Sequence, residues 1–145
     1  MAVTIEEITE FLGKVPMFQG LKPRQLKKLA ARARVRDYTA GTAIVEQGDE
    51  GIGLYIMARG IAEVQRRSAS GDVRILDTLE RFAFFGELSL LDDATRSASV
   101  IAQTDVKAVV LTKLDFLDEL EDDPQMAIVM LKQLAHRFRR IVTNM

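Results

Sequence analysis

Between residues 35 and 113 the chain repeats one pattern, in which short β-branched or alternating apolar runs end at turn residues. Strands are predicted at residues 42–47, 53–59, 61–67, 73–79, 97–102 and 106–112. The predicted turns are Gly48-Asp49, Arg59-Gly60 and Ser70-Gly71-Asp72. Short strands at this spacing are typical of an antiparallel barrel or sandwich, where each strand packs one face on a shared core. We therefore expect an α+β fold that is mainly β, an antiparallel β-barrel or jelly roll (double-stranded β-helix).

Two helices are predicted before the strands. Thr4 and Glu7 have the spacing of a capping box, in which each side chain accepts a hydrogen bond from the other residue's backbone amide. Pro23 suits the first position of a second helix. The second helix is expected to have a basic outer face, formed by Lys27, Lys28, Arg32, Arg34 and Arg36. A solvated helix face explains this run of charge better than a nucleic-acid contact does.

Two more helices are predicted after the strands. Asp115 is the expected cap of a short helix, and Asp123-Pro124 is the expected start of the last one. The last helix has a wide apolar face, and a heptad-like stripe runs along it through Ile128, Leu131, Ala135, Phe138 and Val142. Either both sides of this helix are core, or the stripe meets a twin helix or another protein.

The whole chain is expected to be a single domain over residues 1–145. Its parts are N-terminal helices over 1–34, a β-barrel over 35–113 and C-terminal helices over 114–145, which form a lid. At 145 residues with 48% apolar residues, one compact core is expected.

Composition excludes several classes of function. The chain has no cysteine and one histidine, His136, so disulfides, thiolate catalysis and a metal centre built on Cys or His ligands are not expected. The net charge of −1 gives no overall attraction to nucleic acid or to an anionic membrane, and neither is an expected partner. The sequence has no run of roughly 18 apolar residues and no basic leader at its start, so a cytoplasmic location is expected.

The stretch from Phe84 to Val100 places one acid and one arginine among apolar residues. Gly86 feeds a short predicted turn of helix whose first amides lack partners and attract anions. Nine residues after Glu87, Arg96 has a planar guanidinium that can bind a phosphate through two parallel hydrogen bonds. A carboxylate beside a phosphate is repelled unless it accepts a hydrogen bond from a hydroxyl group. A sugar that has an internal phosphate and a free hydroxyl offers a partner to both side chains. The alternative is a buried Glu87–Arg96 ion pair that only joins two loops.

The run Gly86-Glu87-Leu88-Ser89-Leu90-Leu91, followed after four residues by Arg96-Ser97-Ala98-Ser99-Val100, resembles the phosphate-binding cassette of the cyclic nucleotide-binding domain family, here residues 84–100. The resemblance covers nearly the whole chain. It implies that Glu87 accepts a hydrogen bond from the ribose 2′-hydroxyl and that Arg96 neutralises the cyclic phosphate. The backbone amides of Leu88 and Ser89 would bind the same phosphate, and Gly86 would permit the close approach. The Ser97 hydroxyl would form a hydrogen bond with the phosphate or with the base.

The resemblance also suggests where the base would lie. Leu76 and Leu79, just ahead of the cassette, are expected to form an apolar wall, and Phe138 and Ile141 on the last helix are expected to cover the base. No polar residue that would read the base is evident, so the ligand is expected to be cAMP or cGMP, with no cofactor. Thr95 stands where many members of the family have proline before the arginine.

The expected function is a non-enzymatic sensor or regulatory module that signals by movement of its C-terminal helices. Arg137 could reach back to Glu87 and link the last helix to the bound ligand. The expected partners are the nucleotide and either a second copy or another protein at the last helix. An enzyme such as a phosphodiesterase would need a metal cluster or a general base beside the phosphate. The alternative is a decayed or repurposed domain that serves as a protein-interaction scaffold without binding nucleotide.

Overall fold

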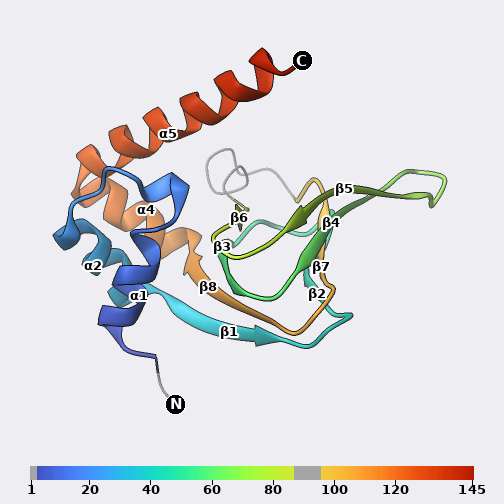
Figure 1. Cartoon of the computed structure of the whole chain (residues 1–145), viewed down its shortest axis with the longest axis horizontal. Helices are drawn as coiled ribbons and strands as arrows, with labels where there is room; N and C mark the ends of the chain where they lie inside the picture. The colour runs from blue at the N-terminus through green and yellow to red at the C-terminus, as the bar shows by residue number, and fades with distance from the viewer. Residues whose placement is uncertain (1–2, 87–95) are drawn as a thin grey trace. The chain divides into compact units, whose positions relative to one another are not determined.

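The computed structural model describes residues 3–86 and 96–145 (Figure 1). The chain divides into two compact units. The β unit comprises Arg34–Lys113, and the helical unit comprises Met1–Ala33 together with Leu114–Met145. The arrangement of the chain as a single domain over residues 1–145 stays a prediction.

The β unit contains two four-stranded antiparallel sheets among its described residues. The first sheet has the order β1-β8-β3-β6, and the second has the order β2-β7-β4-β5. The strands are β1 (Arg34–Tyr38), β2 (Ala43–Val45), β3 (Gly53–Arg59), β4 (Ala62–Arg67), β5 (Val73–Leu79), β6 (Phe84–Phe85), β7 (Ser99–Ala102) and β8 (Val106–Thr112). The sheets form a jelly-roll-like sandwich, which confirms the predicted fold class, although the described strands do not close into a barrel.

The core of the β unit is built from residues of both sheets. In the second sheet the pairs Ala62↔Ala102 and Val64↔Val100 lie on the core side, and Ala62, Ala102 and Val100 are buried. Because successive side chains of a strand point to opposite faces, the alternating pair Gln65↔Ser99 lies on the other side. We call this other side the outer face of the second sheet. A pocket on the outer face is therefore separate from the core side.

Three strands match the predicted bounds, and the others differ at their ends. The strands β3, β5 and β8 have the predicted residues, whereas β2, β4 and β7 are shorter than predicted. The sequence pattern missed β1 and β6 altogether. The strand β1 reads Arg-Val-Arg-Asp-Tyr and therefore lacks a clear apolar alternation, and β6 has only two residues. Arg34 and Arg36 lie on β1, so their assignment to the basic face of the second helix was wrong.

The helical unit contains α1 (Ile5–Leu12), the 3-10 helix η1 (Pro16–Phe18), α2 (Pro23–Arg32), α4 (Lys113–Asp122, whose first residue belongs to the β unit) and α5 (Pro124–Thr143). The predicted capping box is confirmed, since the Glu7 amide donates to Thr4 Oγ1 at 3.2 Å and the Thr4 amide donates to Glu7 Oε1 at 3.4 Å. Pro23 and Pro124 stand at the predicted helix starts, where their missing N–H groups cost no hydrogen bond.

Two side chains of α2 form polar contacts with residues of α4 and with the residue that follows it. Asp115 lies inside the first turn of α4, not at its cap as predicted, and accepts a hydrogen bond from Arg32 Nη1 at 3.2 Å. Arg32 Nε also pairs with the buried Glu119 carboxylate at 2.8 Å, so Arg32 is not part of a solvated basic face. Gln25 Nε2 donates to the Asp123 carboxylate at 2.9 Å, and this hydrogen bond is the main reason that the pKa of Asp123 lies below its usual value.

Candidate functional site

The structure describes three of the six residues predicted to contact the phosphate and ribose: Gly86, Arg96 and Ser97. Glu87, Leu88, Ser89 and Thr95 lie outside the described residues. The described part of the site therefore consists of the two ends of the cassette and what surrounds them.

Arg96 is buried, with 5% of its surface exposed. Its Nη2 donates to the backbone carbonyl of Gly53 at 2.8 Å. Its Cζ lies 5.6 Å from the centroid of the Tyr55 ring, a distance at which the ring quadrupole attracts a cation. These two contacts hold the guanidinium in a defined orientation beside the first residues of β3.

The aromatic ring beneath the guanidinium is itself fixed by a second ring. Tyr55 stacks on Phe85 with the ring centroids 5.0 Å apart and the planes 5° from parallel. The two residues are also paired across β3 and β6. Both side chains belong to the core of the β unit, so the cation rests on a rigid platform and not on a surface loop.

Gly86 contacts the guanidinium from the other end of the cassette. Its φ of +92° lies in the left-handed region, which glycine adopts far more readily than other residues do. A Cβ atom at this position would meet Arg96 Nη1 and would lie 2.5 Å from the Gly53 carbonyl oxygen. The glycine is therefore required twice, by its backbone conformation and by the space that Arg96 fills.

The backbone of Arg96 is held by the turn after β2. The Arg96 amide donates to the Asp49 carbonyl at 2.7 Å, and the Gly48 amide donates to the Arg96 carbonyl at 2.8 Å. Gln47, one residue earlier, donates its amide to Ser99 Oγ at 2.8 Å. Three segments that are distant in sequence thus meet at Arg96: this turn, the start of β3, and β6 with Gly86.

Most of these neighbours of Arg96 carry no signal in the local sequence. Gly53 and Tyr55 read only as residues of a predicted strand, and the pair Gly48-Asp49 read only as a turn. Gly53 and Arg96 are 43 residues apart in the chain, and a local pattern does not report a contact over that separation. The one local signal is the glycine at the first position of β3, because a glycine in a strand often marks the close approach of another group.

The other predicted site residues lie in varied surroundings. Ser97 is exposed, and Leu79 is buried in the core of the β unit. Leu76 is 49% exposed and lies at an irregularity in the register of β4 and β5. Phe138 and Ile141 lie on α5 in the helical unit and are 67% and 56% exposed. Their assignment to a base pocket stays a prediction.

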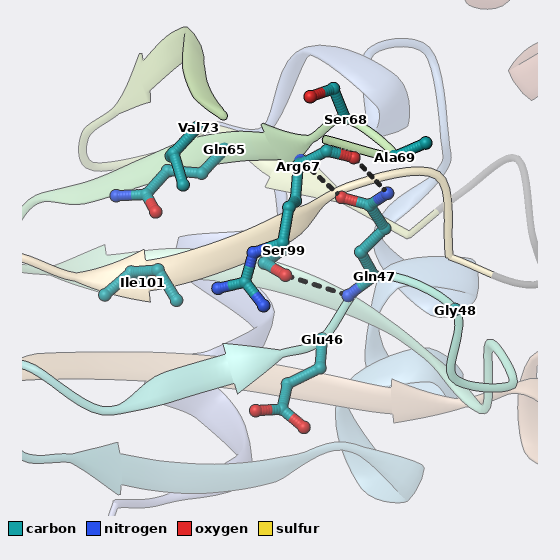
Figure 2. Close-up of a pocket in the computed structure, with 10 residues that line it drawn as sticks. All are labelled: Glu46, Gln47, Gly48, Gln65, Arg67, Ser68, Ala69, Val73, Ser99 and Ile101. Carbon is teal, nitrogen blue, oxygen red and sulfur yellow. Dashed lines mark hydrogen bonds between the residues drawn. The ribbon is translucent and has the colours of Figure 1, made fainter. Parts of the chain in front are cut away.

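A pocket of about 590 Å³ opens on the outer face of the second sheet (Figure 2). Arg67, Gln65, Ser99 and Ile101 contribute to its lining. Because Ser99 and Ile101 alternate with the core residues Val100 and Ala102 along β7, this pocket is separate from the core side.

The side-chain amide of Gln47 takes the place of a neighbouring strand at the edge of this pocket. Its Nε2 donates to the Arg67 carbonyl at 3.0 Å, and its Oε1 accepts from the Arg67 amide at 2.7 Å (Figure 2). Since β7 begins only at Ser99, no backbone of β7 pairs with Arg67, and Gln47 satisfies both groups. The turn that holds Arg96 is thereby also fixed to the end of β4.

The described geometry suits the binding of an anion. A buried, oriented guanidinium beside a glycine bend can bind a phosphate through two parallel hydrogen bonds. Within residues 3–86 and 96–145, no three acidic or histidine side chains gather as they would around a metal ion. In the same residues, no helix combines the length and the apolar character needed to cross a bilayer.

Comparison with known proteins identifies the family. The profile of the cyclic nucleotide-binding domain matches residues 35–123. A cAMP-dependent protein kinase regulatory subunit from Aspergillus fumigatus is 41% identical over 106 residues, which are 73% of this chain and 25% of that protein. The chain spans between 25% and 61% of the length of the first curated relatives that it matches. These relatives are regulatory subunits of kinases and a regulator of transcription.

Solved structures agree on the fold. The catabolite activator protein of Thermus thermophilus has a TM-score of 0.78 and 34% identity, over 89% of this chain and 61% of that one. The regulatory subunit of a cAMP-independent protein kinase A from Trypanosoma brucei has a TM-score of 0.79 and 26% identity, over 91% of this chain and 47% of that one. The family match covers more than half of the chain and includes Gly86 and Arg96. The chain belongs to the cyclic nucleotide-binding domain family.

Proposed function

We propose that this chain is a non-enzymatic regulatory module that binds a cyclic mononucleotide and that cAMP is its preferred ligand. The observation that carries the proposal is the buried guanidinium of Arg96, oriented by Gly53 and Tyr55 and packed against Gly86 at the start of the cassette. Relatives among both the kinase regulatory subunits and the transcriptional regulators are named for cAMP, which supports this nucleotide over cGMP.

In the proposed complex, Arg96 neutralises the cyclic phosphate and Glu87 accepts a hydrogen bond from the ribose 2′-hydroxyl. The amides of Leu88 and Ser89 bind the phosphate, and the Ser97 hydroxyl lies at the phosphate or the base. Leu76 and Leu79 form the apolar wall of the base pocket, with Phe138 and Ile141 as its cover.

The proposed output is a movement of α4 and α5 when the nucleotide binds, with Arg137 linking α5 to Glu87. A ligand can shift such an equilibrium only by its difference in affinity for the two arrangements. Hydrogen–deuterium exchange with and without cAMP tests this step. Changed protection of amides in α5 is expected, and unchanged protection despite saturated binding would rule out the helix movement while leaving the binding proposal intact.

Calorimetry with cAMP and cGMP on the purified chain tests the binding itself. Arg96→Gln should weaken binding at least about tenfold, because a charged hydrogen-bond donor to the phosphate is lost. Arg36→Gln is the matched control, since Arg36 is an exposed arginine on β1 of the same unit. Absence of binding to either nucleotide, or an equal effect of both substitutions, would contradict the proposal.

The second candidate function is a scaffold that keeps the fold and has lost the ligand. The similarity to the regulatory subunit of a protein kinase A described as cAMP-independent supports this alternative. The same calorimetry decides between the two. A folded chain that binds neither nucleotide would favour the scaffold.

A further inference from the structure

The pocket on the outer face of the second sheet belongs to the β unit alone (Figure 2). All ten residues that line it fall within Arg34–Lys113, and the core side of the sheet contributes none of its walls. Its volume of about 590 Å³ lies within the range of roughly 300–1,000 Å³ that is typical of small-molecule sites. The chemistry of the lining therefore indicates which class of small molecule fits there.

The pocket lies where β7 no longer stands between its two neighbours. The strand β4 continues to Arg67, whereas β7 begins at Ser99, whose partner on β4 is Gln65. Beyond Ser99 the backbones on either side are about 10 Å apart, which is twice the spacing of neighbouring strands. The side chain of Gln47 closes this gap through its two hydrogen bonds with the Arg67 backbone, and so gives the pocket a fixed wall.

Arg67 contributes a cation to this pocket. Its side chain extends across β7 toward Ile101 (Figure 2). The ion pairs formed among the described residues do not include Arg67, and its printed hydrogen bonds use only its backbone. A guanidinium binds a carboxylate through two parallel hydrogen bonds. Arg67 can therefore bind a carboxylate that comes from outside the chain.

Glu46 contributes the opposite charge to the same pocket. Val45 packs on the core of the β unit, so the alternation of side chains turns Glu46 to the outer face. Within the described residues its carboxylate forms no ion pair, with Arg67 or with any other cation. A simple anion would be repelled by Glu46, and a simple cation would be repelled by Arg67. The lining therefore favours a molecule that carries both charges.

The rest of the lining supplies neutral polar groups and an apolar surface. Ser99 Oγ accepts a hydrogen bond from the Gln47 amide at 2.8 Å, which leaves its hydroxyl proton to donate elsewhere. The side-chain nitrogen of Gln65 donates to a carboxylate of β4 at 3.1 Å, which leaves its oxygen as an acceptor. Ile101 is half-buried and Val73 is 53% exposed, so the ligand can also cover apolar area.

We propose that this pocket binds a small zwitterion with an apolar body, either a free apolar amino acid or a short apolar peptide. The carboxylate of the ligand binds the Arg67 guanidinium, and its ammonium group binds the Glu46 carboxylate. Its apolar side chain packs on Ile101 and Val73. This ligand is separate from the proposed nucleotide, whose site lies at Arg96.

Titration of the full chain with L-leucine and with leucyl-leucine, followed by NMR in the absence of nucleotide, tests the proposal. Saturable shifts are expected at the amides of Gln65, Arg67 and Ser99. Tighter binding of leucine would identify a free amino acid as the source of the ligand, and tighter binding of leucyl-leucine would identify a peptide. Either result supports the site.

Arg67→Gln should weaken binding of the tighter ligand at least about tenfold, because the charged donor to its carboxylate is lost. The wall of the pocket should persist, since Gln47 bonds the backbone of Arg67 and not its side chain. Arg66→Gln is the matched control. It removes an exposed arginine one residue earlier, whose side chain points to the opposite face of β4, and it should retain the binding.

The N-acetylated form of the same ligand tests the contact with Glu46. This form has no ammonium group, so it should bind the wild-type chain at least about tenfold more weakly. Glu46→Gln should weaken the unmodified ligand by a similar factor and should not weaken the acetylated form further. Circular dichroism confirms that each variant is folded.

Three results would overturn the proposal. The first is the absence of saturable shifts at the pocket with both ligands. The second is an equal effect of Arg67→Gln and Arg66→Gln. The third is an equal loss of the unmodified and the acetylated ligand in Glu46→Gln. Nucleotide binding is measured separately, so none of these results would contradict the proposed function.

Discussion

Replacing Gly86 by alanine tests whether the position of Arg96 depends on the absence of a side chain. The backbone at Gly86 has a φ of +92°, and a Cβ would meet Arg96 Nη1 and the Gly53 carbonyl oxygen, the latter at 2.5 Å. Both neighbours would have to move, and the hydrogen bond from Arg96 Nη2 to Gly53 would be lost or strained.

The expected cost has two parts. Placing alanine in a left-handed conformation costs about 1–2 kcal/mol. Losing a buried hydrogen bond from a charged donor costs roughly 1.5–3 kcal/mol more. The free energy of unfolding should therefore fall by about 2.5–5 kcal/mol, a large share of the roughly 5–15 kcal/mol typical of a domain.

Urea denaturation of the full chain, followed by tyrosine fluorescence, measures this change, because the chain has two tyrosines, Tyr38 and Tyr55, and both lie in the β unit. Gly71→Ala is the control that separates the two parts of the cost. Gly71 has a φ of +91°, and a Cβ added there would meet nothing within 4 Å. The control should lose only about 1–2 kcal/mol. If both variants lost the same free energy, the packing of Arg96 against Gly86 would not be a tight constraint and the reasoning would fail.

Three further substitutions test other contacts of the structure. Gln47→Leu should lower the free energy of unfolding by about 1 kcal/mol and speed hydrogen exchange at the Arg67 amide, because the side-chain amide no longer pairs with that backbone. Arg32→Met should lower the melting temperature by on the order of 5 °C in calorimetry, since the carboxylates it pairs with lose their cation. The hydrogen bond from Gln25 lowers the pKa of Asp123. The ionised carboxylate therefore contributes fully to the free energy of unfolding above about pH 4, and this contribution is lost as the pH falls further. Urea denaturation should therefore show Asp123→Asn less stable than wild type at pH 6, with a smaller difference at pH 3.

Local chemistry accounts for the parts of the fold that were predicted well. The capping box at Thr4 and the prolines at 23 and 124 act within one turn of helix, so their neighbours in sequence are also their neighbours in space. The strands β3, β5 and β8 combine apolar or β-branched residues with clear turn residues at their ends. By contrast, β1 is held by its pairing with β8, and its own charged sequence shows no preference for the core.

The same distinction applies to the site. The cassette motif marks Arg96 in the sequence, but no local pattern marks Gly53 and Tyr55 as its neighbours, because Gly53 lies 43 residues away from Arg96 in the chain. The end of β4 is a similar case. Its backbone is completed by the side chain of Gln47, and a strand pattern has no way to indicate a side chain that acts as a strand.

The placement of Arg96 shows why a short motif can mark a site that is assembled over long range. The guanidinium donates a hydrogen bond to a carbonyl, lies over an aromatic ring and fills a space beside Gly86. That space is open only because Gly86 has no side chain. The acceptor is the carbonyl of Gly53, whose own Cβ would lie 3.2 Å from the Leu111 carbonyl oxygen, so the β3–β8 pairing also favours glycine there. Two glycines therefore fix the cation before any ligand arrives. A preorganised cation avoids the cost of ordering a flexible side chain on binding, so in the proposed complex both glycines would support the contact of the arginine with the phosphate.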